Sequence, residues 1–111
     1  KFIFTHAGGN MPMMLGRMKQ YGPAGLTNLA PFGIEREISR HYFDLAGTAN
    51  RPAVAALKSI VPISKILMGS DNPYVPLMDT ANGLQSLGLS PADLRAIGRE
   101  NALSLLPTLA T

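Results

Sequence analysis

The chain has 111 residues, of which 46% are hydrophobic and 15% are charged. This balance excludes a disordered chain, and the length allows one domain with one core. The formal charge of +3 arises from ten Lys and Arg and seven Asp and Glu without a basic run, so binding to nucleic acid is not expected. Cysteine is absent, which excludes disulfides and thiolate metal sites, and no apolar stretch approaches the roughly 20 residues of a membrane span.

These features fit an intracellular protein, and we expect a cytoplasmic location without membrane contact. The sequence starts at Lys1 and runs directly into an apolar stretch without an initiating methionine. We therefore expect residues 1–111 to be a single unit and a piece of a longer protein. The apolar composition also indicates that some of its surface is buried against residues outside the chain.

The first expected strand is the apolar run at residues 2–4, which the polar residues Thr5 and His6 follow. The glycine pair at 8–9 allows a sharp turn after His6. A helix is expected over residues 13–21, and its methionines are interpreted as core filler rather than metal ligands. The expected buried stripe of this helix consists of Met14, Leu15 and Met18.

The middle of the chain contains a predicted loop, a short helix and a second strand. Residues 22–33 hold two prolines and three glycines, which indicates a long loop, and residues 34–40 alternate in charge, which indicates a short solvated helix. Residues 41–46 predict the strand, in which Asp44 must find a partner if it is buried. His41 begins this strand, away from the expected site, and is interpreted as a surface or packing histidine.

The next predicted helix has Asn50 or Arg51 as its N-cap and ends at Pro62. Four of its apolar residues recur at helical spacing, namely Val54, Leu57, Ile60 and Val61. Residues 66–68 then form an apolar run that predicts a strand buried on both faces, and Asp71 lies just past its end.

Two further helices complete the predicted order of elements. One is expected over residues 77–87, and Gly88 stops it. The other is expected over residues 90–106, with Ser90 as N-cap. Its expected apolar face consists of Leu94, Ile97, Leu103 and Leu106. Strands that alternate with helices in this way predict an α/β fold with parallel strands and right-handed crossovers.

Parallel strands bring the loops after their carboxyl ends to one edge of the sheet. The polar strand ends expected there are Thr5 and His6, Gly47 and Thr48, and Ser70 and Asp71. An imidazole and a carboxylate on one edge can bind a divalent metal, act as an acid and base pair, or make purely structural hydrogen bonds. The residues alone leave the structural and catalytic interpretations open.

Five segments of the chain resemble those of a known protein family: FIFTHAGGNMP, GRM, YFDLAG, ILMGSDNPY and GRENALSLL. At this spacing they resemble the C-terminal third of the amidohydrolase-related family, which includes decarboxylases of aminocarboxymuconate semialdehyde, resorcylate and methylsalicylate, and some lactone hydrolases. The resemblance implies a metal-dependent TIM barrel. Residues 2–5, 42–46 and 66–69 would be its sixth, seventh and eighth strands, so the chain would hold the last three βα units of a (β/α)8 barrel, incomplete as given.

The same resemblance implies roles for two residues. His6, in the HxGG motif, would be a catalytic acid/base beside the metal and its water. Asp71, in the GSDxP motif, would be a catalytic residue and a metal ligand, or would lie against the metal's water. The implied cofactor is a divalent metal, zinc or alternatively manganese. The family's HxH pair and its fifth-strand histidine are absent here, and a zinc site needs about three protein ligands. The chain alone is therefore expected to be inactive.

The resemblance implies that the parent protein is a decarboxylase of a small aromatic or dienoic carboxylic acid. Two alternatives stay open, a metal-dependent hydrolase of a lactone or amide, and a non-catalytic subunit that completes a barrel. A three-stranded parallel sheet leaves strand edges and apolar faces uncovered, so we expect a homo-oligomer or a complementing chain.

Overall fold

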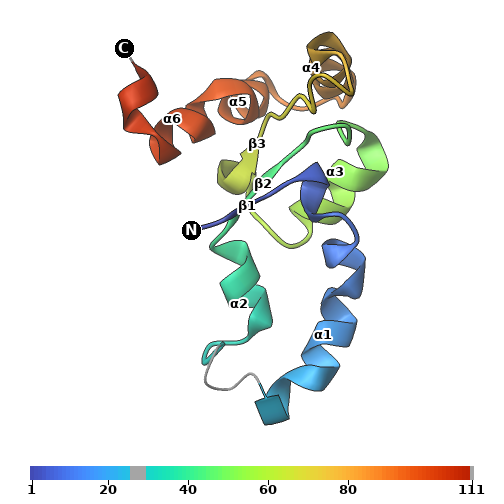
Figure 1. The fold of residues 1–111 in the computed structure, drawn as a ribbon, viewed down its shortest axis with the longest axis vertical. Helices are drawn as coiled ribbons and strands as arrows, with labels where there is room; N and C mark the ends of the chain where they lie inside the picture. The colour runs from blue at the N-terminus through green and yellow to red at the C-terminus, as the bar shows by residue number, and fades with distance from the viewer. Residues whose placement is uncertain (26–29, 111) are drawn as a thin grey trace.

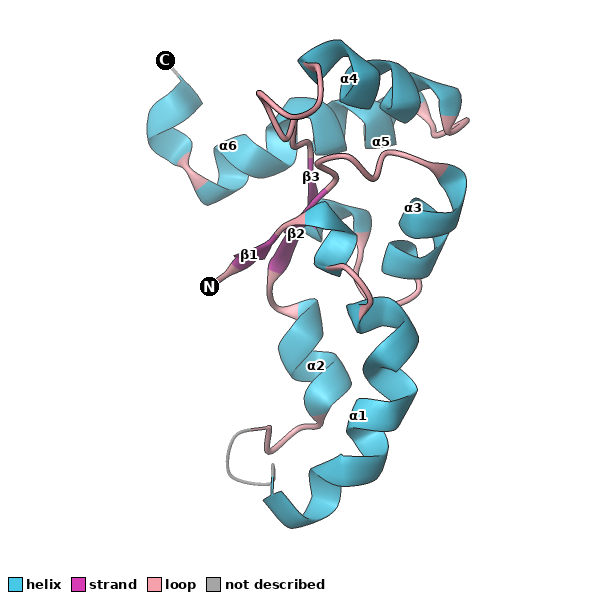
Figure 2. Ribbon diagram, turned by 45° about the vertical axis from the view of Figure 1, so that its right-hand side comes forward, coloured by secondary structure: helices cyan, strands magenta, loops and turns pink. Residues whose placement is uncertain are grey.

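Three short parallel strands form the centre of the structure. The computed structural model describes residues 1–25 and 30–110. The strands are β1 (Ile3–Phe4), β2 (Tyr42–Asp44) and β3 (Ile66–Leu67), in the spatial order β1-β2-β3. In their register, Ile3 lies opposite Tyr42 and Phe43 lies opposite Ile66. The predicted parallel sheet is thus confirmed, and Figure 2 shows its strands between two groups of helices.

The helices connect the strands and continue after the last of them. They are α1 (Met11–Gly25), α2 (Ile34–Ser39), α3 (Arg51–Lys58), α4 (Leu77–Ser86), α5 (Pro91–Arg95) and α6 (Asn101–Leu105), with short turns η1 (His6–Gly8), η2 (Ile63–Lys65), η3 (Ala96–Glu100) and η4 (Pro107–Ala110). Helices α1 and α2 lie on one side of the sheet, and α4, α5 and α6 lie on the other (Figure 1). Within the described ranges, none of the helices is both long and apolar enough to cross a membrane.

Helix α1 is longer than the sequence predicts. It begins at Met11 and continues to Gly25, so residues 22–25 were wrongly assigned to a loop. A glycine costs a helix about 1 kcal/mol and a proline about 3 kcal/mol relative to alanine, which weakens a helix without forbidding it. Residues 26–29 of the predicted loop lie outside the described residues.

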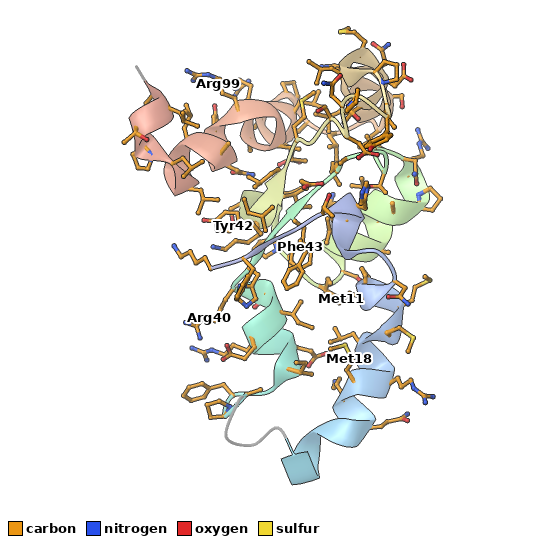
Figure 3. All side chains as sticks on the ribbon, in the orientation of Figure 1. Met11, Met18, Arg40, Tyr42, Phe43 and Arg99 are labelled. Carbon is orange, nitrogen blue, oxygen red and sulfur yellow. The ribbon has the colours of Figure 1, made fainter. Side chains whose placement is uncertain are left out.

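The hydrophobic core gathers around β2 and the face of α3 that meets it. Phe43, Leu57, Ile66 and Ile97 are fully buried, and Figure 3 shows Phe43 at the centre of the molecule. The predicted stripe of the third helix is confirmed, since Val54, Leu57 and Val61 are buried and Ile60 packs against them. Asn50 caps this helix as predicted, because its side chain accepts a hydrogen bond from the Ala53 N–H.

The expectation that the methionines fill the core is only partly correct. Met11 and Met18 pack against the core cluster, and Leu15 of the predicted stripe is buried. Met14, in contrast, is exposed, as are Met13 and Met78. The stripe of α1 is narrower than predicted because a single neighbouring layer, formed by α2 and α3, covers the helix.

The predicted last helix is interrupted by a π-helical turn. Helix α5 passes into η3 and then α6, and its N-cap Ser90 accepts a hydrogen bond from the Asp93 N–H as predicted. Leu106 follows the end of α6 and is exposed, whereas Asn101 lies four residues after the buried Ile97, on the same helix face, and is buried. The Asn101 amide Nδ2 donates to the carbonyl oxygens of Ile63 (2.7 Å) and Ile66 (2.8 Å), which fixes the start of β3.

Replacement of Asn101 with alanine is expected to destabilise the fold by about 2–4 kcal/mol, because the carbonyls of Ile63 and Ile66 each lose a hydrogen-bond donor. The midpoint of urea unfolding measures this loss. Ser104→Ala is the matched control, since the Ser104 hydroxyl makes only a hydrogen bond to the Asn101 carbonyl within the same helix. Equal midpoints for the two variants would show that Asn101 does not hold β3.

Candidate functional site

The carboxyl ends of the three strands bring His6 and Asp71 together. His6 follows β1, Asp71 follows β3, and the His6 Nε2 lies 4.0 Å from the Asp71 Oδ1. The two side chains are 45% and 31% exposed, so a small molecule can reach both. Gly47, which follows β2, lies beside the pair, and an added Cβ there would sit 3.8 Å from the His6 Nδ1 and 3.8 Å from the Asp71 Oδ2.

The His6 ring is oriented by a backbone carbonyl. Its Nδ1 lies 2.7 Å from the Ala46 oxygen. A carbonyl oxygen only accepts hydrogen bonds, so Nδ1 carries the proton in this contact and Nε2 is the nitrogen directed towards Asp71. The nitrogen nearest to Asp71 is therefore the one that the Ala46 carbonyl does not engage.

Both site residues adopt unusual backbone conformations. His6 has φ of 54° and Asp71 has φ of 60°, in the left-handed region that non-glycine residues rarely occupy. Strained residues of this kind persist when surrounding contacts determine them, and they are enriched at functional sites. Around Asp71 these contacts include the Tyr74 and Val75 N–H groups, which both donate to the Asp71 carbonyl oxygen.

The other polar strand ends differ in their contacts. The Thr5 hydroxyl donates to Asp44, and the Ser70 hydroxyl accepts from the Asn72 N–H. The Thr48 hydroxyl is buried and has no hydrogen-bond partner among the described residues. The hydrogen bonds of Thr5 and Ser70 therefore go to groups other than the His6 and Asp71 side chains, while Thr48 lines the same pocket as His6.

Asp44 confirms the expectation that a carboxylate in this strand needs partners. Its Oδ1 accepts hydrogen bonds from the Thr5 hydroxyl (3.1 Å), the His6 N–H (3.1 Å) and the Ala46 N–H (3.0 Å). The sequence interpretation did not assign Asp44 to the site. The sequence feature that could have pointed to Asp44 is a charged residue inside an otherwise apolar strand.

His41 lies where the sequence predicted, at the start of β2 and away from the site. Its ring lies edge-on to the rings of Phe2 and Phe4, with centroids 5.5 Å and 5.7 Å away, and its Nδ1 accepts a hydrogen bond from the Phe2 N–H. These contacts agree with the interpretation of His41 as a packing residue.

The donor set matches a divalent metal in chemistry but is incomplete in number. A carboxylate oxygen and an imidazole nitrogen both suit zinc or manganese, and they meet at the sheet edge where ligands bind in α/β proteins. Across residues 1–25 and 30–110, however, no group of three or more His, Cys, Asp or Glu side chains converges. The described residues thus fit part of a metal ligand set.

Comparison with known proteins gives consistent matches along the chain. A family model described as amidohydrolase matches residues 1–108. The 6-methylsalicylic acid decarboxylase of Penicillium expansum is 28% identical over 114 aligned positions, which cover 98% of this chain and 35% of that protein.

Solved structures show the same fold. A 2,6-dihydroxybenzoate decarboxylase from Rhizobium superposes with a TM-score of 0.78 and 19% identity over 96% of this chain and 34% of that one. A dihydroxybenzoic acid decarboxylase from a Polaromonas species, crystallised with manganese and the inhibitor 2-nitroresorcinol, superposes with a TM-score of 0.79 and 19% identity over 98% of this chain and 34% of that one.

The chain spans about a third of the length of these relatives, which are decarboxylases of aromatic carboxylic acids. Its three parallel βα units match the corresponding part of their TIM barrels, which confirms the predicted fold class. The family model covers nearly the whole chain. The chain therefore belongs to the amidohydrolase family.

Proposed function

We propose that the complete protein is a metal-dependent decarboxylase of an aromatic or dienoic carboxylic acid. The observation that carries this proposal is the approach of the His6 Nε2 to the Asp71 Oδ1, at 4.0 Å, on the edge of the sheet where ligands bind. The relatives that are named for decarboxylation of methylsalicylic and dihydroxybenzoic acids support the reaction and the substrate class.

Asp71 is the residue of this chain that would hold the metal, through its carboxylate. When bound, a divalent metal supplies positive charge that orients and polarises the oxygens of the substrate. We propose zinc, with manganese as the alternative, and manganese is the metal named with the Polaromonas relative. The remaining ligands would come from residues outside this chain, because about three protein ligands are needed.

His6 would deliver the proton that decarboxylation requires. Loss of carbon dioxide breaks the bond between the ring carbon and the carboxylate and leaves an electron pair on that carbon, which a proton must take up. The Nδ1–H group is engaged by the Ala46 carbonyl, so the transferred proton would be the second one, held on Nε2 of the doubly protonated ring. The neutral imidazole then regains a proton from solvent, which reaches the half-exposed side chain.

Two observations support the alternatives of a hydrolase and of a partial domain that pairs with further protein. The family is named for amide hydrolysis, and the same two side chains would serve a lactone or amide hydrolase. The outer strand β1 leaves Phe2 67% and Ile3 50% exposed, which favours a strand or helix of further sequence against it. We therefore propose that residues 1–111, as one partial domain, lie in a homo-oligomer or pair with a complementing chain. A cytoplasmic location stays a prediction.

The reaction is tested with a panel of substrates and the full-length protein loaded with zinc or manganese. The panel contains hydroxylated benzoic acids and dienoic acids together with lactones and amides. We expect release of carbon dioxide from one or more of the acids and no hydrolysis of the other compounds. Hydrolysis of a lactone or amide without release of carbon dioxide would assign the protein to the hydrolases instead.

The 111-residue chain alone is expected to bind zinc or manganese weakly, because its described residues offer His6 and Asp71 without a third converging ligand. Calorimetric titration of the isolated chain measures this affinity, and the full-length protein is the comparison. Stoichiometric zinc binding at submicromolar concentration by the monomeric isolated chain would contradict the incomplete ligand set.

A further inference from the structure

Asp44 is the last residue of the central strand β2, and one of its oxygens binds three donors. The Thr5 hydroxyl and the His6 N–H reach it from the end of β1, and the Ala46 N–H reaches it from the same strand, all within 3.0–3.1 Å. Hydrogen bonds to an ionised carboxylate are about twice as strong as those between neutral groups. The carboxylate therefore extends the connection between β1 and β2 beyond the last paired residues of the ladder.

These contacts hold His6 at two points. The Asp44 Oδ1 accepts from the His6 backbone, and the same oxygen accepts from the backbone of Ala46, whose carbonyl binds the imidazole Nδ1 at 2.7 Å. The φ of 54° at His6 is costly for a residue with a Cβ, so the conformation depends on such contacts. One carboxylate oxygen thus sets both the backbone of His6 and the group that orients its ring.

Gly69, just after β3, lies close to this carboxylate. A Cβ added to Gly69 would lie 2.9 Å from the Asp44 Oδ1 and 3.0 Å from the Ala46 nitrogen, so a side chain at this position would displace one of them. Glycine at position 69 is therefore explained by Asp44. All three strand ends then meet at the oxygen that holds His6.

We propose that Asp44 is a positioning residue for His6: it keeps the imidazole in the tautomer with the proton on Nδ1 and directs Nε2 towards Asp71. The consequence for turnover rests on the proposed function, in which His6 transfers a proton. The consequence for the tautomer does not rest on it. A misplacement of about 1 Å in a proton donor can lower turnover about 100-fold.

The test uses the zinc-loaded full-length protein with ¹⁵N-labelled histidine, and the His6 signals are assigned by their loss in His6→Gln. In the unsubstituted protein we expect one ring tautomer, with Nδ1 protonated. In Asp44→Asn we expect ring nitrogen shifts that average between the two tautomers, and a kcat that is lower by about 10- to 100-fold with little change in KM. Asp93→Asn, at a partly buried carboxylate in the first turn of α5, is the matched control and should leave both measurements unchanged.

Two further variants keep the proposal testable if Asp44→Asn does not fold. Thr5→Val removes one donor to the carboxylate without a change in charge, and Gly69→Ala displaces the carboxylate without removing it. Each should shift the His6 tautomer signal in the direction of Asp44→Asn. Variants that melt earlier but keep the single Nδ1-protonated tautomer and normal turnover would overturn the proposal. A shifted tautomer in a protein in which His6→Ala keeps full activity would leave the positioning role intact and refute only the proton transfer by His6.

Discussion

Replacement of His6 with alanine in the full-length protein is expected to lower turnover by about 100- to 10,000-fold, the usual loss when a general acid or base is removed. The side chain is 45% exposed and lies outside the hydrophobic core, so its removal creates no large cavity. Its ring makes one hydrogen bond, from Nδ1 to the Ala46 carbonyl, and the loss of that bond should cost about 1 kcal/mol of stability. Turnover should therefore fall while the unfolding transition stays cooperative and close to that of the unsubstituted protein.

His41→Ala is the matched control for this experiment. It removes the other histidine of the chain, which packs against Phe2 and Phe4 at the far end of the sheet. This variant should lose stability and keep the turnover number of its folded fraction. The opposite result for His6→Ala, early melting with nearly normal decarboxylation or hydrolysis, would end the catalytic assignment of His6 and leave it a structural residue.

The proximity of His6 and Asp71 could be predicted because it depends on the order and direction of the strands and not on local backbone geometry. Both residues directly follow apolar runs of the kind that forms buried parallel strands, and the ends of such strands meet at one edge. The apolar run at residues 66–68 also predicted its own burial, since Ile66 and Leu67 are buried in the structure. The alternation of short strands with helices is thus sufficient to predict the fold and the proximity of the His6 and Asp71 side chains.

Features that depend on backbone geometry could not be predicted in this way. The group that orients the His6 ring is the carbonyl of Ala46, and a backbone carbonyl leaves no mark in the sequence. Asn101 is buried although it is polar, because it lies four residues after the buried Ile97 on the same helix face, whereas the spacing of leucines predicted Leu106, which follows the end of α6 and is exposed. Helix α1 continues through residues 22–25 although their glycines and proline have weak helix propensity.

Replacement of Asp71 with asparagine is expected to lower the affinity of the full-length protein for its metal by at least about 10- to 100-fold, with activity partly restored by excess metal. The change removes the negative charge of the ligand and keeps its shape. Asparagine also tolerates the φ of 60° found at position 71, so the loop conformation should survive. Metal content after dialysis, measured by elemental analysis, gives the loss directly, and activity as a function of added zinc or manganese gives the recovery.

Asp79→Asn is the matched control for the loss of metal, because Asp79 is an exposed carboxylate in the first turn of α4, close in sequence to Asp71. It should keep its metal and its activity. The comparison with His6→Ala then separates the two roles, since that variant should retain metal and stay inactive at any metal concentration, whereas Asp71→Asn should lose metal first and respond to its return. An Asp71→Asn protein that keeps a full equivalent of metal after dialysis would remove Asp71 from the ligand set and leave its carboxylate as a partner of His6 alone.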